Sequence, residues 1–157
     1  MLKNIISFLF LVAVFLVSCT PKEPQDESAV LDDFRAEENL EKKIEIFENF
    51  SETNPKSKYL QSMLSRIVRT FSKDKEFVKA ADYLKNNSEF ATSNMYNSIA
   101  WSIFESKENL ELGSGLAKAG TELARKELAN IEETKPDKAT IEEWEDSKKS
   151  SLAMILD

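Results

Sequence analysis

The sequence predicts an all-α protein in which antiparallel helical hairpins follow a signal peptide and a short flexible tether. Three observations predict this fold. Glycine occurs only three times and proline four times in 157 residues, so few positions interrupt a helix. Beyond residue 30, apolar residues recur at steps of three and four. No stretch of strand length alternates between apolar and polar residues.

The first 18 residues have the features of a secretory signal peptide. Lys3 gives a positive amino-terminal region, and an apolar run follows from Ile5 to Val17. At about 1.5 Å per residue this run is too short to cross about 30 Å of hydrocarbon as a helix. Removal of the signal leaves 139 residues, about the size of one domain.

Residues Leu16-Val17-Ser18-Cys19 resemble the lipobox of bacterial lipoproteins. The resemblance implies cleavage after Ser18, diacylglycerol on the Cys19 thiol, and an acylated amino terminus, with palmitate among the fatty acids. Two or more acyl chains anchor a protein stably, whereas one holds it marginally. Thr20 stands where some inner-membrane lipoproteins carry aspartate, so the resemblance favours the outer membrane of a bacterial cell envelope, with the domain in the periplasm. An ordinary secretory signal with an incidental cysteine is the alternative.

Residues 19–29 form the predicted tether, and residues 30–157 the predicted helical domain. From Thr20 to Ser28 the chain has two prolines, several charges and no apolar residue, which is typical of an unpacked segment.

The composition excludes several classes of function. The chain has 28 acidic and 21 basic residues and a net charge of −7, which disfavours a nucleic-acid partner. It has no histidine and one cysteine, so it lacks a Ser-His-Asp triad, a Cys-His pair, a CxxC motif and a cysteine zinc site. Four carboxylate pairs, at 32–33, 37–38, 132–133 and 142–143, have the pattern of solvated helix faces. We expect no enzymatic activity, cofactor or metal, and the sequence identifies no small-molecule substrate.

Two apolar stripes, separated by Asn54-Pro55, predict the first helical hairpin. The first stripe comprises Leu40, Ile44, Phe47 and Phe50. The second comprises Tyr59, Leu60, Met63, Leu64, Ile67, Val68 and Phe71.

Two further helices follow. Asp74 is the expected N-cap of one helix, which carries Phe77, Ala81 and Leu84 and ends near residue 86. The next runs from Ser93 to Ser106, and its expected buried side comprises Tyr96, Ile99, Ala100, Ile103 and Phe104.

The segment from 108 to 133 contains all three glycines of the chain. Gly113, Ala117, Gly120 and Ala124 follow one another at steps of four, three and four, and so form a ridge of small residues on one helix face. Such a ridge predicts a close contact with a neighbouring helix, for which we expect residues 93–106. The alternative is a flexible loop at residues 113–115, since paired glycines also mark breaks.

The helical pair from Tyr96 to Ala124 resembles a tetratricopeptide repeat, with large residues on the first helix and small ones on the second. The order of lipobox, hairpins and glycine-bearing helix, with the motif NSIAW at 97–101, is also similar to the helical region beside a thioredoxin-like domain in some envelope lipoproteins. In those proteins a CxxC, absent here, supplies the redox chemistry.

The last segment begins with a Thr-x-x-Glu capping box at Thr140 and Glu143. Its apolar residues are Ile141, Trp144, Leu152, Ile155 and Leu156. We expect either that this end docks on the preceding helices or that a further repeat is missing after it.

These features predict a lipid-anchored scaffold that binds a protein or peptide. Trp101, Tyr83 and Tyr96 are candidate contact residues where exposed, although aromatic residues at helical spacing usually pack inward. The alternative function is that of the helical region of a thioredoxin-like thiol oxidoreductase without its CxxC domain. A purely structural envelope lipoprotein is a third possibility.

Overall fold

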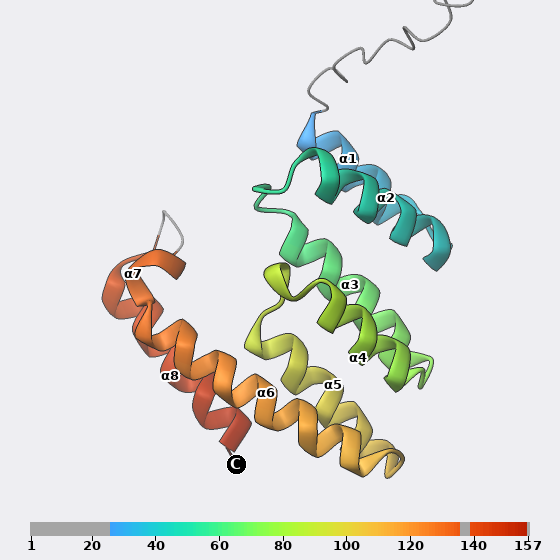
Figure 1. The fold of residues 1–157 in the computed structure, drawn as a ribbon. Helices are drawn as coiled ribbons and strands as arrows, with labels where there is room; N and C mark the ends of the chain where they lie inside the picture. Colours follow the sequence, from blue (N-terminus) through green and yellow to red (C-terminus); the bar gives the residue numbers. More distant parts are fainter. Residues whose placement is uncertain (1–25, 136–138, 157) are drawn as a thin grey trace, which may run out of the picture.

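The computed structural model describes residues 26–135 and 139–156, in which it contains eight α-helices, one 3-10 helix and no strand (Figure 1). The all-α prediction is therefore confirmed for this part of the chain. The elements are α1 Glu27–Ala36, α2 Leu40–Thr53, α3 Leu60–Lys73, α4 Phe77–Asn86, η1 Ser88–Phe90, α5 Ser93–Ser106, α6 Leu110–Ala129, α7 Ile131–Thr134 and α8 Ile141–Leu156.

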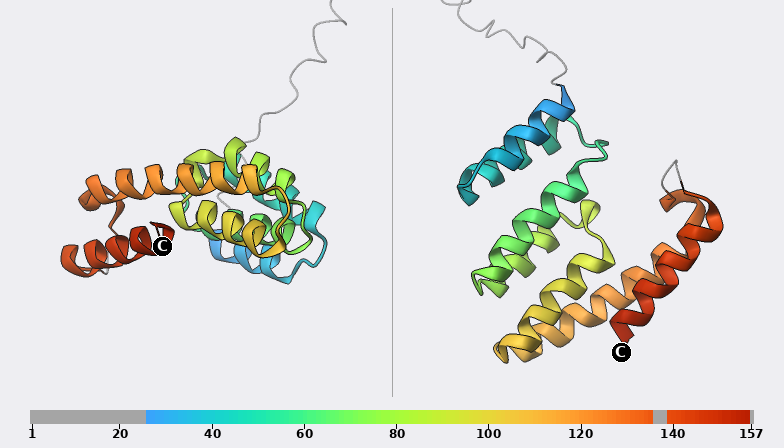
Figure 2. Two further views of the ribbon diagram at one scale, coloured as in Figure 1. Left: turned by 90° about the horizontal axis from the view of Figure 1, so that it is seen from below. Right: turned by 180° about the vertical axis from the view of Figure 1, so that it is seen from behind.

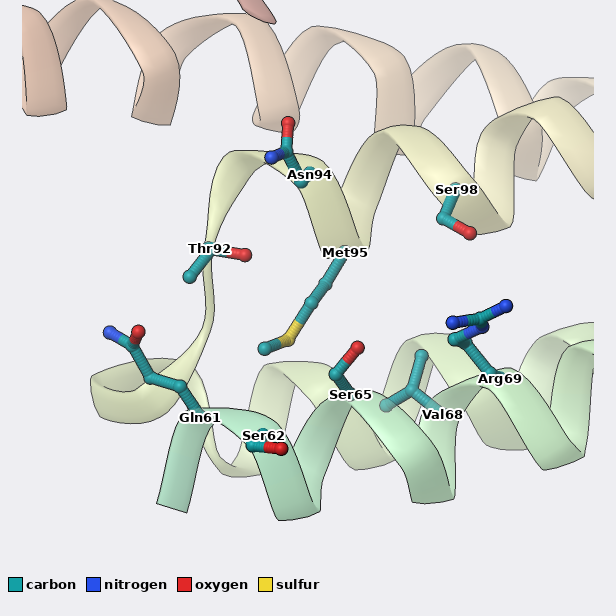
Figure 3. A pocket seen from close by; sticks show the side chains of 9 residues that line it. All are labelled: Gln61, Ser62, Ser65, Val68, Arg69, Thr92, Asn94, Met95 and Ser98. Atoms are coloured by element: carbon teal, nitrogen blue, oxygen red, sulfur yellow. The ribbon is translucent and has the colours of Figure 1, made fainter. Parts of the chain in front are cut away.

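The helices form three antiparallel pairs that stack side by side (Figures 1 and 2). The pairs are α1 with α2, α3 with α4, and α5 with α6. Their first helices begin at Glu27, Leu60 and Ser93, which are 33 residues apart in both steps. Helix α3 contacts α2, α4 and α5, so it lies between its neighbouring pairs, and α5 runs beside it (Figure 3). Helix α8 packs along α6 (Figure 2).

One hydrophobic cluster joins the three pairs. Helix α3 contributes most to it, because the predicted stripe from Leu60 to Phe71 is buried along its whole length. Phe34 of α1, Phe47 of α2 and Ile99 of α5 belong to the same cluster and are fully buried. The buried residues of the three pairs therefore form one continuous core.

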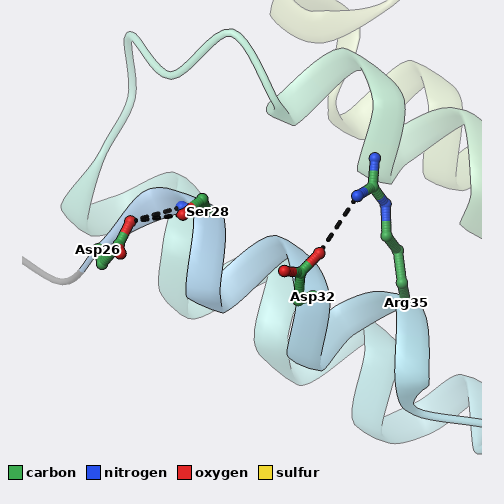
Figure 4. A network of polar contacts seen from close by, with 4 residues as sticks. All are labelled: Asp26, Ser28, Asp32 and Arg35. Carbon is green, nitrogen blue, oxygen red and sulfur yellow. Dashed lines mark hydrogen bonds and ion pairs between the residues drawn. The ribbon is translucent and has the colours of Figure 1, made fainter.

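Helix α1 begins inside the segment predicted to be a tether. The tether was expected to extend to residue 29, but the helix starts at Glu27 and Asp26 is its N-cap. The Asp26 carboxylate accepts hydrogen bonds of 3.0 and 2.8 Å from the backbone N–H and hydroxyl of Ser28, which lower its pKa (Figure 4). Leu31 and Phe34 are the buried residues that hold this helix against the core. The 3.2 Å ion pair between Arg35 and Asp32 is exposed and contributes little.

The expected start of α4 is wrong. Asp74 is the C-cap of α3, and α4 starts three residues later, after Glu76 as its N-cap. Between them Lys75 adopts a positive φ of 59°, which reverses the chain direction.

At α8 the predicted capping box is confirmed. Glu143 Oε2 accepts a hydrogen bond from the Thr140 N–H at 3.0 Å, and the Glu143 N–H donates one to Thr140 Oγ1 at 3.2 Å.

Helix α6 runs unbroken through all three glycines, none of which has a positive φ. The flexible-loop alternative at residues 113–115 is therefore wrong. A Cβ at Gly113 would lie 2.7 Å from Cγ2 of Ile103, and one at Gly120 would lie 3.0 Å from Cβ of Tyr96. Both neighbours belong to α5, the helix that the ridge was expected to contact. Ala117, between the two glycines, is half-buried against the core.

The predicted signal peptide with Leu16, Val17, Ser18 and Cys19 lies outside the described residues. Among the helices that the structure does describe, none combines the length and apolar character needed to cross a membrane.

The three glycines of α6 give a matched test of its packing. A Cβ at Gly115 would meet no atom within 4 Å, so we expect Gly115→Ala to raise the free energy of unfolding by about 1 kcal/mol through helix propensity. Gly120→Val would push a branched side chain into α5, and we expect a loss of about 1 to 3 kcal/mol. Urea denaturation of both variants measures these changes. An unchanged midpoint for Gly120→Val would contradict the close contact.

Candidate functional site

A groove between α3 and α5 is the candidate functional site (Figure 3). Its volume is about 410 Å³. It is lined by Gln61, Ser62, Ser65, Val68, Arg69, Thr92, Asn94, Met95 and Ser98.

The pairing of the two helices explains why this groove has an apolar floor and a polar rim. Val68 and Met95 are almost fully buried, because they lie where α3 and α5 turn toward each other and toward the core. The other residues that line the groove do not reach that core, and most of them are exposed. Figure 3 shows Met95 and Ser65 pointing into the gap, and Arg69 reaching from α3 toward Ser98 on α5.

A second hollow of about 460 Å³ adjoins the groove on the other side of α3. It is lined by Lys43, Ser62, Ser65, Arg66, Arg69 and Thr70. Three of these residues, Ser62, Ser65 and Arg69, also line the first hollow, so the two form one continuous surface across α3. We call this surface the α3 groove.

The charged groups that line the α3 groove are all basic. Neither hollow has an aspartate or glutamate among its lining residues in the part of the chain that is described. Helix α3 itself contains no acidic residue. Arg66 and Arg69 are exposed, and neither forms an ion pair within residues 26–135 and 139–156. Their guanidinium groups are therefore available to a ligand.

The residues of the α3 groove do not stand out as a site in the sequence. They are spread over two helices and match no short motif, and their neighbours along the chain are core residues. One signal was present, since the segment 54–73 contains basic residues and no acidic one in a chain with a net charge of −7.

The three aromatic residues considered as contact residues have different positions. Tyr83 packs between Phe47 and Phe71, with ring centroids 6.2 and 6.0 Å away. Its hydroxyl is buried without a hydrogen-bond partner among the described residues, and burial, with the charge of Glu48, raises its pKa. Tyr96 is half-buried against Gly120. Neither tyrosine offers an open contact surface.

Trp101 is a surface residue, with 59% of its area exposed. Phe104 was expected on the buried side of its helix, but it is 64% exposed and its ring centroid lies 5.7 Å from that of Trp101. Helix α6 covers the side of α5 that carries Ala100 and Ile103, and Phe104 lies beyond the edge of that contact.

A buried ion pair joins α8 to the α5–α6 pair. Glu127 of α6 and Lys148 of α8 lie 2.8 Å apart, and each side chain is only 11% exposed. The Glu127 carboxylate also accepts hydrogen bonds from the N–H and hydroxyl of Ser93, at 3.0 and 2.9 Å, at the start of α5. Lys148 Nζ lies 4.5 Å from the ring centroid of Trp144. Three helices thus meet at one carboxylate.

Burial raises the pKa of Glu127, and the hydrogen bonds from Lys148 and Ser93 lower it by more, so the pKa lies below the ordinary carboxyl value. Such a pair is a structural tie, because the Lys148 ammonium and the two Ser93 donors hold the carboxylate in the ionised state.

No group of three potential metal ligands occurs within the described residues. No protein-family model matches this chain, and comparisons with curated proteins and with solved structures give no match either. We therefore infer function from the residues and geometry of the chain itself.

The Glu127 ion pair predicts a pH-dependent contribution to stability. We expect Glu127→Gln to lower the free energy of unfolding at pH 7 by roughly 3 kcal/mol, because it leaves the Lys148 ammonium buried without its counterion. The wild-type carboxylate has a lowered pKa when folded. Its contribution is therefore present above the ordinary value of 4.5 and is lost as the pH falls through the folded-state value.

Chemical denaturation of both proteins between pH 7 and pH 2 measures this dependence. The two stabilities should converge at the acid end. Glu122→Gln, at an exposed position on the same helix, serves as the control and should change stability little. A constant difference between Glu127→Gln and wild type across the range would contradict the assignment.

Proposed function

We propose that this chain is a lipid-anchored protein of the bacterial cell envelope that binds an extended polypeptide segment in the α3 groove. The observation that carries the proposal is the groove itself, which combines an apolar floor with a rim of unshielded polar side chains. The proposed role is binding and not catalysis.

The chemistry of the groove fits an extended polypeptide. Gln61 and Asn94 carry side-chain amides, which can both donate to a backbone carbonyl and accept from a backbone N–H. Val68 and Met95 lie at the bottom of the groove, where the small exposed part of the flexible methionine thioether offers an apolar contact to the ligand. The adjoining hollow beyond Arg69 extends the surface along the ligand.

The stacked pairs support a tetratricopeptide-like scaffold. Their first helices recur every 33 residues, close to the roughly 34 of that repeat. The second helix of the third pair carries Gly113, Ala117 and Gly120, the small positions on which the resemblance was based. In stacks of this kind the helical pairs present an extended binding surface. The first hollow of the α3 groove lies between α3 and α5, which are the first helices of their pairs.

The lipobox supports attachment at Cys19. Six residues, 20–25, separate Cys19 from the N-cap of α1, and even fully extended they span at most roughly 25 Å. A lipid on Cys19 would therefore hold the groove close to the membrane surface. A polypeptide bound there would be a component of the envelope or a protein passing through it.

Photo-crosslinking in the bacterium that makes this protein tests the proposal. A photoreactive amino acid replaces Ser98, in the groove, or Lys118, at an exposed position of α6 outside it. We expect discrete adducts with a protein from position 98 and none of the same size from position 118. Absence of adducts at both positions, or identical adducts from both, would contradict binding in the groove.

The same cells test the anchor through Cys19→Ser. We expect this variant to remain an uncleaved precursor, to incorporate no labelled fatty acid, and to give fewer adducts from position 98. Normal processing and labelling of the variant would contradict lipid attachment at Cys19.

A further inference from the structure

Positive charge is concentrated around α3 in a chain that is acidic overall. Residues 54–73 contain no aspartate or glutamate. Their basic residues are Lys56, Lys58, Arg66, Arg69 and Lys73. The chain as a whole has a net charge of −7, so this segment differs in sign from the rest. Solubility does not require such segregation, because mixed charges on every helix would serve equally well.

The geometry directs part of this charge into one hollow. Arg66 and Arg69 are one helical turn apart on α3, and Lys43 of α2 lines the same hollow. Lys43 Nζ lies 5.6 Å from the ring centroid of Phe34, which is fully buried, so this ammonium group is held against the core. Two arginines of α3 and one lysine of α2 therefore border the same hollow.

The hydrogen-bonding groups around these cations suit a carboxylate. A carboxylate only accepts hydrogen bonds, and an arginine fork can bind both of its oxygens at once. Ser62 and Ser65, whose hydroxyls can donate, lie at the centre of the α3 groove and belong to both hollows. No acidic residue among those described lines the groove to compete for the arginines.

We propose that the polypeptide bound in the α3 groove is acidic, and that Arg66, Arg69 and Lys43 bind its carboxylates. This inference rests on the proposed function and specifies its ligand. Arg69 lines both hollows, so it acts where the acidic residues of the ligand meet the part that lies over Val68 and Met95.

A polypeptide fits better than a nucleic acid or a phospholipid surface. Nucleic acids derive affinity from many phosphate contacts along a basic surface, and three cations on a chain of net charge −7 cannot supply them. A phospholipid headgroup would use the cations but not the amide groups of Gln61 and Asn94 or the apolar floor. A peptide engages both parts of the groove.

A binding measurement with defined peptides tests the inference. The full chain is held in nonionic detergent, and the probes are fluorescein-labelled dodecapeptides of alternating glutamate and alanine or of alternating glutamine and alanine. At low ionic strength we expect the glutamate peptide to bind at least ten-fold more tightly than the glutamine peptide. Added salt should reduce this difference, because the groove is open to solvent.

Two charge reversals of equal size distinguish binding in the α3 groove from attraction that depends only on the net charge of the chain. Arg69→Glu should weaken binding of the glutamate peptide at least ten-fold. Arg125→Glu, at an exposed position of α6 outside the groove, should change it less than two-fold. Arg66→Gln combined with Arg69→Gln gives the same test without introducing a negative charge. Circular dichroism melts verify that the variants are folded.

Equal affinity for the two peptides would overturn the acidic-ligand inference while leaving groove binding intact. Absence of binding to either peptide would also overturn it, and crosslinking from position 98 tests the proposed function independently. Displacement of the glutamate peptide by millimolar inorganic phosphate or glycerophosphoglycerol, but not by unlabelled peptide, would assign the groove to phosphate groups and overturn the inference. Equal weakening of binding by Arg69→Glu and Arg125→Glu would show that the net charge of the chain, and not the α3 groove, determines the affinity. This result would also overturn the inference.

Discussion

The burial of the apolar stripe on α3 is the constraint on which the rest of the structure depends. This stripe is too wide for one partner helix, and α3 accordingly contacts α2, α4 and α5. The pair of α1 and α2 has only four buried residues, Leu31, Phe34, Phe47 and Phe50, so it depends on α3 for its core. Stability in such a stack comes from interfaces between neighbours, as in repeat proteins.

The α3 groove follows from this packing. Placing α3 beside α5 buries Val68 and Met95 and leaves most of the other residues that line the groove exposed. The close contact of α5 with α6 through Gly113 and Gly120 fixes the other side of α5, and the Glu127 carboxylate ties its first residue to α8. The groove is therefore supported from both sides by rigid helices, which suits binding of a ligand without large rearrangement.

Sequence patterns predicted the helices with strong periodicity and missed features that depend on distance in space. The stripe from Tyr59 to Phe71 and the small-residue ridge were visible because a single helix carries each of them. Helix α1 was missed because its acidic residues continue the composition of the tether, and only Leu31 and Phe34 mark its buried side. Because α1 was missed, the 33-residue recurrence of the first helices could not be recognised. Because Phe104 was assigned to the core, the exposed edge of α5 could not be recognised either. The α3 groove could not be predicted, since its residues come from helices that only the fold brings together.

Native-state hydrogen exchange of Ile67→Ala tests the central claim most directly, because Ile67 is fully buried in the middle of α3. Truncation of such a residue costs about 2 to 5 kcal/mol. If the α3 stripe is the shared core, the slowest amides of α2, α3, α4 and α5 should lose protection together and by a similar factor. Loss of protection confined to α3 and α4, with α2 and α5 unchanged, would contradict the account and show that the pairs are independent units.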